Sequence, residues 1–203
     1  MKSILEYYKL YPFSRFLGLL YCLIKTKLFY PSARMIRFPF DIRGKKSIYF
    51  GEGFTAGFGC RIEAYPSNPS DVVIKIGSNV QINDYVHITA MRNVMIGNNV
   101  LIASKVYISD CSHGNYSGNG VQSTPYSIPK DREYMMKDVI IGNNVWIGEQ
   151  VSILPGVLIG DGTIVGSNSV VTRSLPSNVI AVGVPARPIK KFNFESQKWE
   201  IIK

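Results

Sequence analysis

The chain has 203 residues, and its 46% hydrophobic and 18% charged residues are those of one packed globular domain and exclude a disordered chain. The net charge of +9 lies at the two ends: residues 1–46 hold ten Lys and Arg against two acids, and residues 187–203 hold five against two. An anionic partner is therefore expected at the ends. Three widely spaced cysteines give neither a disulfide framework nor a metal knuckle, which favours a reducing, cytoplasmic setting.

Residues 1–40 form a basic segment around one apolar run, Phe16–Ile24. The run is too short to span a bilayer, and Lys25 stands where a signal-peptide cleavage site would need small residues. It therefore predicts a short amphipathic or buried helix. Two placements remain open for this helix: peripheral contact with an anionic inner membrane, or packing on the rest of the protein or on a neighbouring subunit.

Aliphatic residues recur at every sixth position along most of the remaining chain. Their three runs are Ile76, Ile82, Ile88, then Ile96, Ile102, Ile108, and after a gap Ile141, Ile147, Ile153, Ile159, Val165, Val171. A second small or branched residue stands two positions before most of them, as Val100 does before Ile102. A helix would repeat at three and four residues and a half-buried strand at two, so neither explains this period.

A period of six predicts an all-β, three-sided coil of eighteen residues whose sides are short parallel strands. Corners such as Gly97–Asn99 and Gly142–Asn144 supply residues that tolerate unusual φ. We predict this parallel β-helix for residues 41–186, with less regular first coils over 48–64. Residues 114–137 interrupt it as a long excursion loop, which in a compact fold is functional or disordered. Residues 187–203 are predicted to be a basic tail.

Several motifs of the ladder resemble those of the hexapeptide-repeat acyltransferases, over roughly residues 35–200. The shared motifs are Ile141–Gly148, Ile153–Val157 and Gly183–Arg187. The resemblance implies a left-handed helix, a homotrimer and acetyl-CoA as co-substrate. Three further segments look most like the O-acetyltransferases of lipopolysaccharide O-antigen assembly: Arg37–Pro39, Gln81–His87 and Ile108–Gly114. The implied acceptor is a sugar hydroxyl of a bacterial surface polysaccharide or its precursor; an amino sugar, a nucleotide sugar or a xenobiotic remains an alternative.

Acetyl transfer to a hydroxyl needs a base, and the chain has two histidines, His87 and His113. His113 falls on the family's catalytic histidine, whereas His87 is expected to be structural or to lie beside the substrate. In similar enzymes an Asn thirty residues before the base holds the acceptor, which points to Asn83, although a plain corner Asn is the alternative. Asp110 could orient the histidine, contact the sugar, or be an exposed corner carboxylate. With eighteen residues per coil, Asn83 and His113 start from different sides, so we expect them to meet across two subunits.

Trp146 occupies an outward position, as a platform for the pantetheine arm of coenzyme A or as a trimer contact. By resemblance, Gly148 and Ser167 would give backbone contacts to that arm. Basic and polar residues near the end of the ladder would reach the phosphates, the alternative for each being a solvated tail; they are Thr172, Arg173, Arg187 and Lys190.

Rival chemistries are weaker on this sequence. Cys111, close to His113, allows a covalent acyl-enzyme, although family members transfer directly in a ternary complex. A zinc enzyme of this fold needs three histidine ligands, so no metal is expected. A nucleotidyltransferase would need a phosphate-binding domain before the ladder. A non-enzymatic solenoid would show flat, repetitive Thr faces, and no nucleic acid partner is expected.

Overall fold

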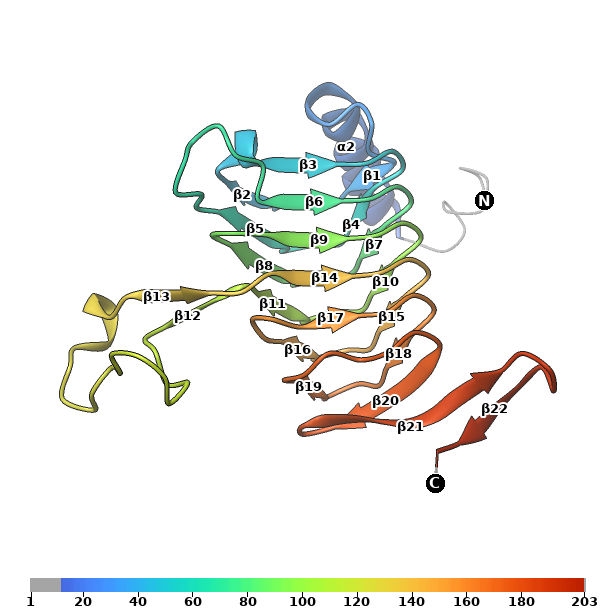
Figure 1. Cartoon of the computed structure of the whole chain (residues 1–203). Coiled ribbons are helices and arrows are strands. Elements are labelled where there is room, and N and C mark those ends of the chain that lie inside the picture. Colours follow the sequence, from blue (N-terminus) through green and yellow to red (C-terminus); the bar gives the residue numbers. More distant parts are fainter. Residues whose placement is uncertain (1–11, 203) are drawn as a thin grey trace.

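The computed structural model describes residues 12–202 and shows a stack of short strands wound into a three-sided prism (Figure 1). Three sheets form its sides, which we call faces A, B and C. Face A contains β1 (Met35–Ile36), β4 (Thr55–Ala56), β7 (Gln81–Ile82), β10 (Leu101–Ile102), β15 (Trp146–Ile147), β18 (Ile164–Val165), β20 (Val179–Gly183), β21 (Ala186–Asn193) and β22 (Lys198–Ile201). Face B contains β2 (Asp41–Arg43), β5 (Arg61–Ala64), β8 (His87–Ala90), β11 (Tyr107–Ser109), β16 (Ser152–Ile153) and β19 (Val170–Val171). Face C contains β3 (Ile48–Phe50), β6 (Ile74–Ile76), β9 (Val94–Ile96), β14 (Val139–Ile141) and β17 (Leu158–Ile159).

The chain visits the faces in the order A, B, C and then begins the next coil. Trp146 pairs with Ile164, eighteen residues on, which confirms the predicted coil length in this part of the ladder. Gln81 instead pairs with Leu101, twenty residues on, because the turn between β8 and β9 is longer. The ladder begins at Met35, ahead of the expected start at residue 41.

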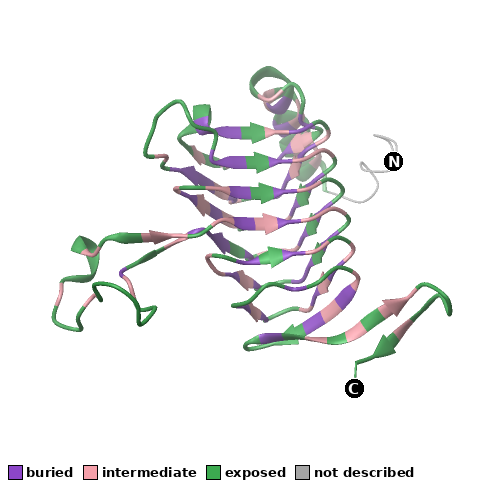
Figure 2. Cartoon of the chain, in the orientation of Figure 1, coloured by how far each residue is buried: buried purple, intermediate pink, exposed green. Residues whose placement is uncertain are grey.

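The inside of the prism is lined by the predicted aliphatic residues (Figure 2). Ile102, Ile108 and Ile147, for example, are fully buried. Full burial of one such side chain is worth about 1.5–3 kcal/mol, so the stacked columns are the main source of the fold's stability. At the corner between faces C and A, Asn99 and Asn144 adopt positive φ of 56°, and the side-chain amide of Asn99 donates to Asn144 Oδ1 at 3.3 Å. The corner role predicted for these asparagines is confirmed.

The apolar run near the N-terminus lies in a helix, α2 (Phe13–Phe29), which packs beside β1. The Ile36 N–H donates to Thr26 Oγ1 at 2.8 Å, and Thr26 Oγ1 donates to the Cys22 carbonyl at 2.7 Å. Among residues 12–202, no helix is long and apolar enough to cross a membrane. Residues 1–11 of the predicted basic segment lie outside the described residues.

An aromatic cluster fills the N-terminal end of the prism next to α2. It contains Tyr30, Phe40, Phe50 and Phe54, whose neighbouring rings lie 4.7–6.5 Å apart between centroids. Phe54 is fully buried. A short 3-10 helix, η1 (Lys45–Ser47), connects β2 to β3 beside this cluster.

The excursion is an ordered arm that projects from the prism (Figure 1). Its base is an antiparallel pair, β12 (Cys111–His113) with β13 (Tyr134–Met136), and its far part holds a 3-10 helix, η2 (Pro129–Asp131). The arm therefore starts before the expected residue 114. At the C-terminal end, β21 and β22 form an antiparallel hairpin that extends face A and includes most of the predicted basic tail.

Candidate active site

Four residues at the corner between faces A and B stand in one column, directly after the strands of successive coils. They are Asn83, Ala103, Gly148 and Gly166, which we call the corner column. Each backbone N–H donates to a carbonyl one coil further on, as Gly148 does to Val165 O at 2.8 Å. The sequence repeat thus places the predicted acceptor residue Asn83 and the predicted cofactor residue Gly148 in line. Beyond Asn83 the column carries only a methyl group or no side chain, which leaves its surface open.

Gly148 and Ser167, both predicted to contact pantetheine, are brought together. A Cβ on Gly148 would lie 2.6 Å from the Ser167 nitrogen, so only glycine fits here. The Glu149 N–H donates to Ser167 Oγ at 3.2 Å, which fixes this hydroxyl at the corner.

Trp146 faces outward on face A, as predicted, with 50% of its surface exposed. It pairs with Leu101 on one side and Ile164 on the other. These side chains form an apolar strip beside the corner column, a surface that fits an extended, largely apolar ligand.

The predicted phosphate contacts are divided between two corners. Arg187 is exposed just after the turn from β20 to β21, next to the C-terminal end of the corner column, and its Nη1 donates to Ala186 O at 3.0 Å. Lys190 lies further along β21, opposite Ile180. Thr172 and Arg173 are exposed after β19, at the far side of face B, so the single chain does not bring them to Arg187.

His113 is exposed on the arm, where its ring lies against Tyr134 with 4.4 Å between the ring centroids and a 45° angle between the planes. Within residues 12–202 neither ring nitrogen has a hydrogen-bond partner, so both are open to a ligand. Asn83 follows a face A strand, whereas His113 follows a face B strand and sits out on the arm. The two residues lie at opposite ends of face B within one chain.

Asp110 holds a backbone turn inside the ladder. It is fully buried, and its carboxylate accepts hydrogen bonds from the backbone N–H groups of Met91, Arg92 and Asn93 at 2.7–3.1 Å. These three residues form the longer turn between β8 and β9. A carboxylate used in this way holds the backbone, so the alternative that Asp110 is an exposed corner carboxylate is wrong.

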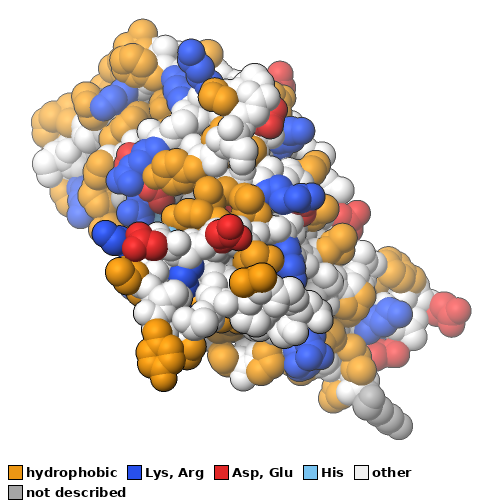
Figure 3. Space-filling view, turned by 60° about the vertical axis from the view of Figure 1, so that its left-hand side comes forward, with side chains coloured by type: hydrophobic (Ala, Val, Ile, Leu, Met, Phe, Trp, Pro, Cys, Tyr) orange, Lys and Arg blue, Asp and Glu red, His pale blue; other side chains and the backbone are white. Residues whose placement is uncertain are grey.

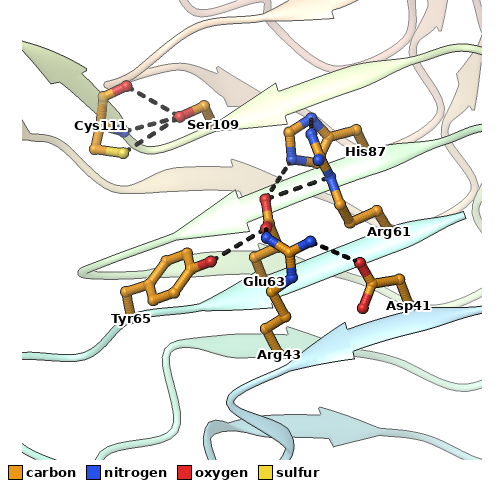
Figure 4. A network of polar contacts seen from close by, with 8 residues as sticks. All are labelled: Asp41, Arg43, Arg61, Glu63, Tyr65, His87, Ser109 and Cys111. Carbon is orange, nitrogen blue, oxygen red and sulfur yellow. Dashed lines mark hydrogen bonds and ion pairs between the residues drawn. The ribbon is translucent and has the colours of Figure 1, made fainter.

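His87 belongs to a polar network on face B (Figure 4) that sequence reasoning missed. Its Nε2 lies 2.8 Å from Glu63 Oε2, and Arg43 Nη1 donates to Glu63 Oε1 at 2.6 Å. Burial raises the pKa of Glu63, but its contacts with His87, Tyr65 and the two arginines outweigh this and hold that pKa below its usual value. The sequence spacing could have suggested this network, because Arg61 and His87 are in register on adjacent parallel strands and Glu63 follows Arg61 by two residues.

Cysteines flank both halves of the candidate site. Cys60 is buried, its thiol lies 2.9 Å from the Asn83 carbonyl oxygen, and burial raises its pKa to about 11, so it stays protonated and stabilises the corner. Burial likewise raises the pKa of Cys111, which disfavours the thiolate that a covalent acyl-enzyme would need.

Tyr85 stands at the corner next to Asn83 and Asp84, and it lines two hollows. The larger, about 540 Å³, lies between this corner and α2. The smaller, about 360 Å³, opens on face B and is lined partly by Arg61 and His87.

Comparison with known proteins agrees with this fold. The bacterial transferase hexapeptide family (six repeats) matches residues 138–173. An Escherichia coli protein that carries the name lipopolysaccharide biosynthesis O-acetyl transferase WbbJ is 45% identical over 197 residues, which cover 97% of this chain and 98% of that protein. The chain belongs to the hexapeptide-repeat acetyltransferase family. This acetyltransferase is therefore a left-handed parallel β-helix, as the resemblance implied.

Other relatives of the acetyltransferase are more distant. Galactoside O-acetyltransferase of Escherichia coli is 42% identical over 120 residues, 59% of this chain and 55% of that enzyme. The structure of AntD, an N-acyltransferase from Bacillus cereus in complex with dTDP and 3-hydroxybutyryl-CoA, superposes with a TM-score of 0.67 at 23% identity, over 85% of this chain and 90% of AntD. At this identity the match supports the fold alone. Within residues 12–202 of the acetyltransferase, no three His, Cys, Asp or Glu residues form a group that could hold a metal ion.

Proposed function

We propose that the protein transfers an acetyl group from acetyl-CoA to a sugar hydroxyl of a bacterial surface polysaccharide or its precursor. The observation that carries this proposal is the corner column, which joins the predicted coenzyme A contacts to Asn83 along one open line. The 45% identity to the lipopolysaccharide O-acetyl transferase WbbJ supports a sugar acceptor. Coenzyme A would lie along this column, with its arm on Trp146, Gly148 and Ser167. Its phosphates would then reach Arg187 and Lys190 or, if a neighbouring subunit supplies them, Thr172 and Arg173.

In this proposal His113 is the general base. Its free ring nitrogen takes the proton from the acceptor hydroxyl, whose oxygen forms a bond to the thioester carbonyl carbon. The carbon–sulfur bond then breaks, and the proton passes to the departing coenzyme A thiolate. The Asn83 side chain orients the acceptor hydroxyl by hydrogen bonding.

The direct test is mass spectrometry of glycans from cells that produce either the wild-type protein or the His113→Ala variant. We expect a mass difference of one acetyl group per modified sugar. Identical glycans from the two strains, with both proteins folded, would refute the proposal. An assay of the purified protein with acetyl-CoA and the isolated glycan should give the same result.

The site is completed between subunits of a homotrimer in this proposal, because His113 and Asn83 lie at opposite ends of face B within one chain. Mixed trimers of the inactive variants His113→Ala and Asn83→Ala test this. A shared site restores activity, up to about one quarter of wild type for random mixing, since some interfaces receive both intact residues. A site within one chain gives no recovery, and neither does either variant assembled alone.

Helix α2 is proposed to rest on an anionic membrane surface. Its side away from β1 exposes an apolar stripe at helical spacing: Phe13, Leu17, Leu20, Ile24 and Leu28. The helix carries Arg15, Lys25 and Lys27 and no acid, and elsewhere on the molecule too, exposed apolar side chains are interspersed with Lys and Arg (Figure 3). This combination fits an interfacial helix attracted to anionic lipids.

Vesicle flotation tests the membrane contact. The double variant Leu20→Gln/Ile24→Gln should bind anionic vesicles more weakly than wild type while binding coenzyme A equally well. Leu158→Gln, which alters an equally exposed leucine on face C, is the matched control. Unchanged flotation of the double variant would exclude this contact.

A further inference from the structure

The larger hollow lies between α2 and the corner that carries Asn83, and it has the composition of a site for a charged lipid. Its apolar surface comes from Leu19 of α2 and from Phe38, Phe58 and Tyr85. Arg15 and Arg37 line the same space. An apolar wall with two guanidinium groups is typical of sites that bind phosphate attached to an apolar group.

The two arginines are available for a ligand. Both are exposed, and neither side chain makes a hydrogen bond or ion pair with another residue in 12–202. Lys25 adds positive charge behind the wall, with its Nζ 4.2 Å from the centroid of the Phe38 ring. Asp84 is the one acid among the described lining residues, and it already accepts the Phe58 N–H at 2.8 Å. The forked guanidinium groups match the oxygens of a phosphate or diphosphate.

Tyr85 lines the groove at the corner next to Asn83. Its φ is +58°, and Lys105 and Gln150, at the same corner of the next two coils, have a φ of +59°, so this backbone conformation belongs to the repeat. The residue is 54% exposed, and its ring contacts Phe58 edge to face, with 5.7 Å between centroids. An exposed aromatic side chain next to Asn83 is available to contact a ligand.

We infer that this groove binds the lipid-diphosphate end of the acceptor, so that the enzyme modifies a glycan carried on a polyprenyl diphosphate. This inference rests on the proposed function and names its substrate class. The phosphates contact Arg15 and Arg37, the first part of the lipid chain lies on Phe38 and Leu19, and the glycan extends past Tyr85 toward Asn83. The exposed apolar stripe of α2 lies on the same helix as Arg15, so the lipid has a short path from a membrane surface to the groove.

The test compares three acceptors that carry the same sugar: the glycan on a polyprenyl diphosphate, a nucleoside diphosphate sugar and a phosphate-free glycoside. In the Arg15→Ala/Arg37→Ala double variant, we expect the KM for the lipid-linked acceptor to rise about 10–100-fold, as loss of charge-assisted hydrogen bonds predicts. The KM for the phosphate-free glycoside, the KM for acetyl-CoA and kcat should stay unchanged. Arg15→Lys/Arg37→Lys should recover part of the loss, and Lys75→Ala, on face C, is the control for lost charge.

Two outcomes would overturn the inference. If the wild type uses the phosphate-free glycoside as well as the lipid-linked acceptor, the groove does not recognise phosphate. If the nucleoside diphosphate sugar is the preferred acceptor with the same dependence on the arginines, the lipid assignment is wrong. In both cases acetyl transfer itself stands.

A binding measurement separates this inference from the proposed function. Wild type should float with neutral phosphatidylcholine vesicles that contain polyprenyl diphosphate more than with vesicles that lack it, and the double alanine variant should lose that difference. If no acceptor is acetylated but this difference remains, the proposed reaction fails and the groove assignment stands. If flotation is equal for all, the groove assignment fails.

Discussion

The two halves of the candidate site rest on different kinds of structure. The corner column stands on the ladder, where each coil is tied to the next by backbone hydrogen bonds and filled with buried isoleucines. His113 stands on the arm, whose base is one short antiparallel pair and whose far part exposes Val121 and Tyr126 at 93% and 96%. Strict repetition therefore positions the proposed coenzyme A surface and Asn83, whereas a departure from repetition carries His113, the proposed base.

This difference predicts which substitutions affect chemistry and which affect stability. Changes on the arm should alter the reaction while the fold survives. Changes inside the ladder should destabilise the fold before they alter the reaction.

The largest effect is expected from His113→Ala. Removal of a general base lowers kcat by about 10²–10⁴-fold, and unfolding by urea should be unchanged because the side chain is exposed. Ser112→Ala, next to it on β12, should keep wild-type kcat. An active His113→Ala enzyme would remove the arm from the mechanism.

The contribution of the ladder to stability is tested with Ile102→Ala. This fully buried residue stacks between Ile82 and Ile147, and its truncation should cost about 2–5 kcal/mol of unfolding free energy in urea titrations. Tyr126→Ala on the arm should change that free energy by less than about 0.5 kcal/mol. Similar losses for both variants would contradict the division between ladder and arm.

Trp146→Ala sharpens the assignment of the column to coenzyme A. Loss of an exposed aromatic platform should raise the KM for acetyl-CoA about tenfold, equivalent to about 1.4 kcal/mol, without lowering the melting temperature. Tyr49→Ala removes a comparably exposed aromatic residue from face C and serves as control. An unchanged KM in Trp146→Ala would leave Trp146 to a trimer contact.

Glu63→Gln should flatten the acid side of the stability profile. Because the pKa of Glu63 is lowered in the folded state, its ionised form stabilises the protein above the ordinary glutamate value of about 4.3. That contribution is lost as pH falls from this value through the lowered folded pKa. Chemical denaturation at a series of pH values should therefore show a smaller acid loss in Glu63→Gln than in wild type. Parallel profiles would show that the network contributes nothing.

The smallest effect is expected from Cys111→Ser, which should retain kcat within about twofold, because direct transfer needs no cysteine nucleophile. Steady-state kinetics with acetyl-CoA measure this. A loss comparable to that of His113→Ala would instead support an acyl-enzyme.

The sequence predicts the regular ladder well and the segments that depart from the repeat less well. The period of six predicted that the repeating aliphatic residues from Ile76 to Val171 lie inside the prism and that Trp146 lies outside it. This worked because equivalent positions of successive coils have the same environment. Asp110 was misjudged, since its three partners lie in a turn two residues longer than the repeat allows. The hairpin of β21 and β22 was missed because Pro185 and Pro188 indicated an exit from the ladder, whereas the chain reverses and pairs antiparallel.

The candidate site was predictable only in part, for a physical reason. Asn83, Gly148 and Ser167 occupy repeat positions, so their alignment follows from counting. His113 and Arg15 lie outside the repeat, and contacts between distant segments, such as the groove between α2 and Tyr85, leave no periodic trace in the sequence.

The aromatic cluster of Tyr30, Phe40, Phe50 and Phe54 caps the N-terminal end of the prism. A stack of identical coils has open ends on which a further coil, from the same or another molecule, could pair without limit. Large rings fill the interior at the first coil, and α2 lies beside β1 at the same end. We expect this cover to disfavour the end-to-end addition of coils from another molecule. The ladder can therefore contain many coils while four side chains at this end limit the pairing of one molecule with another.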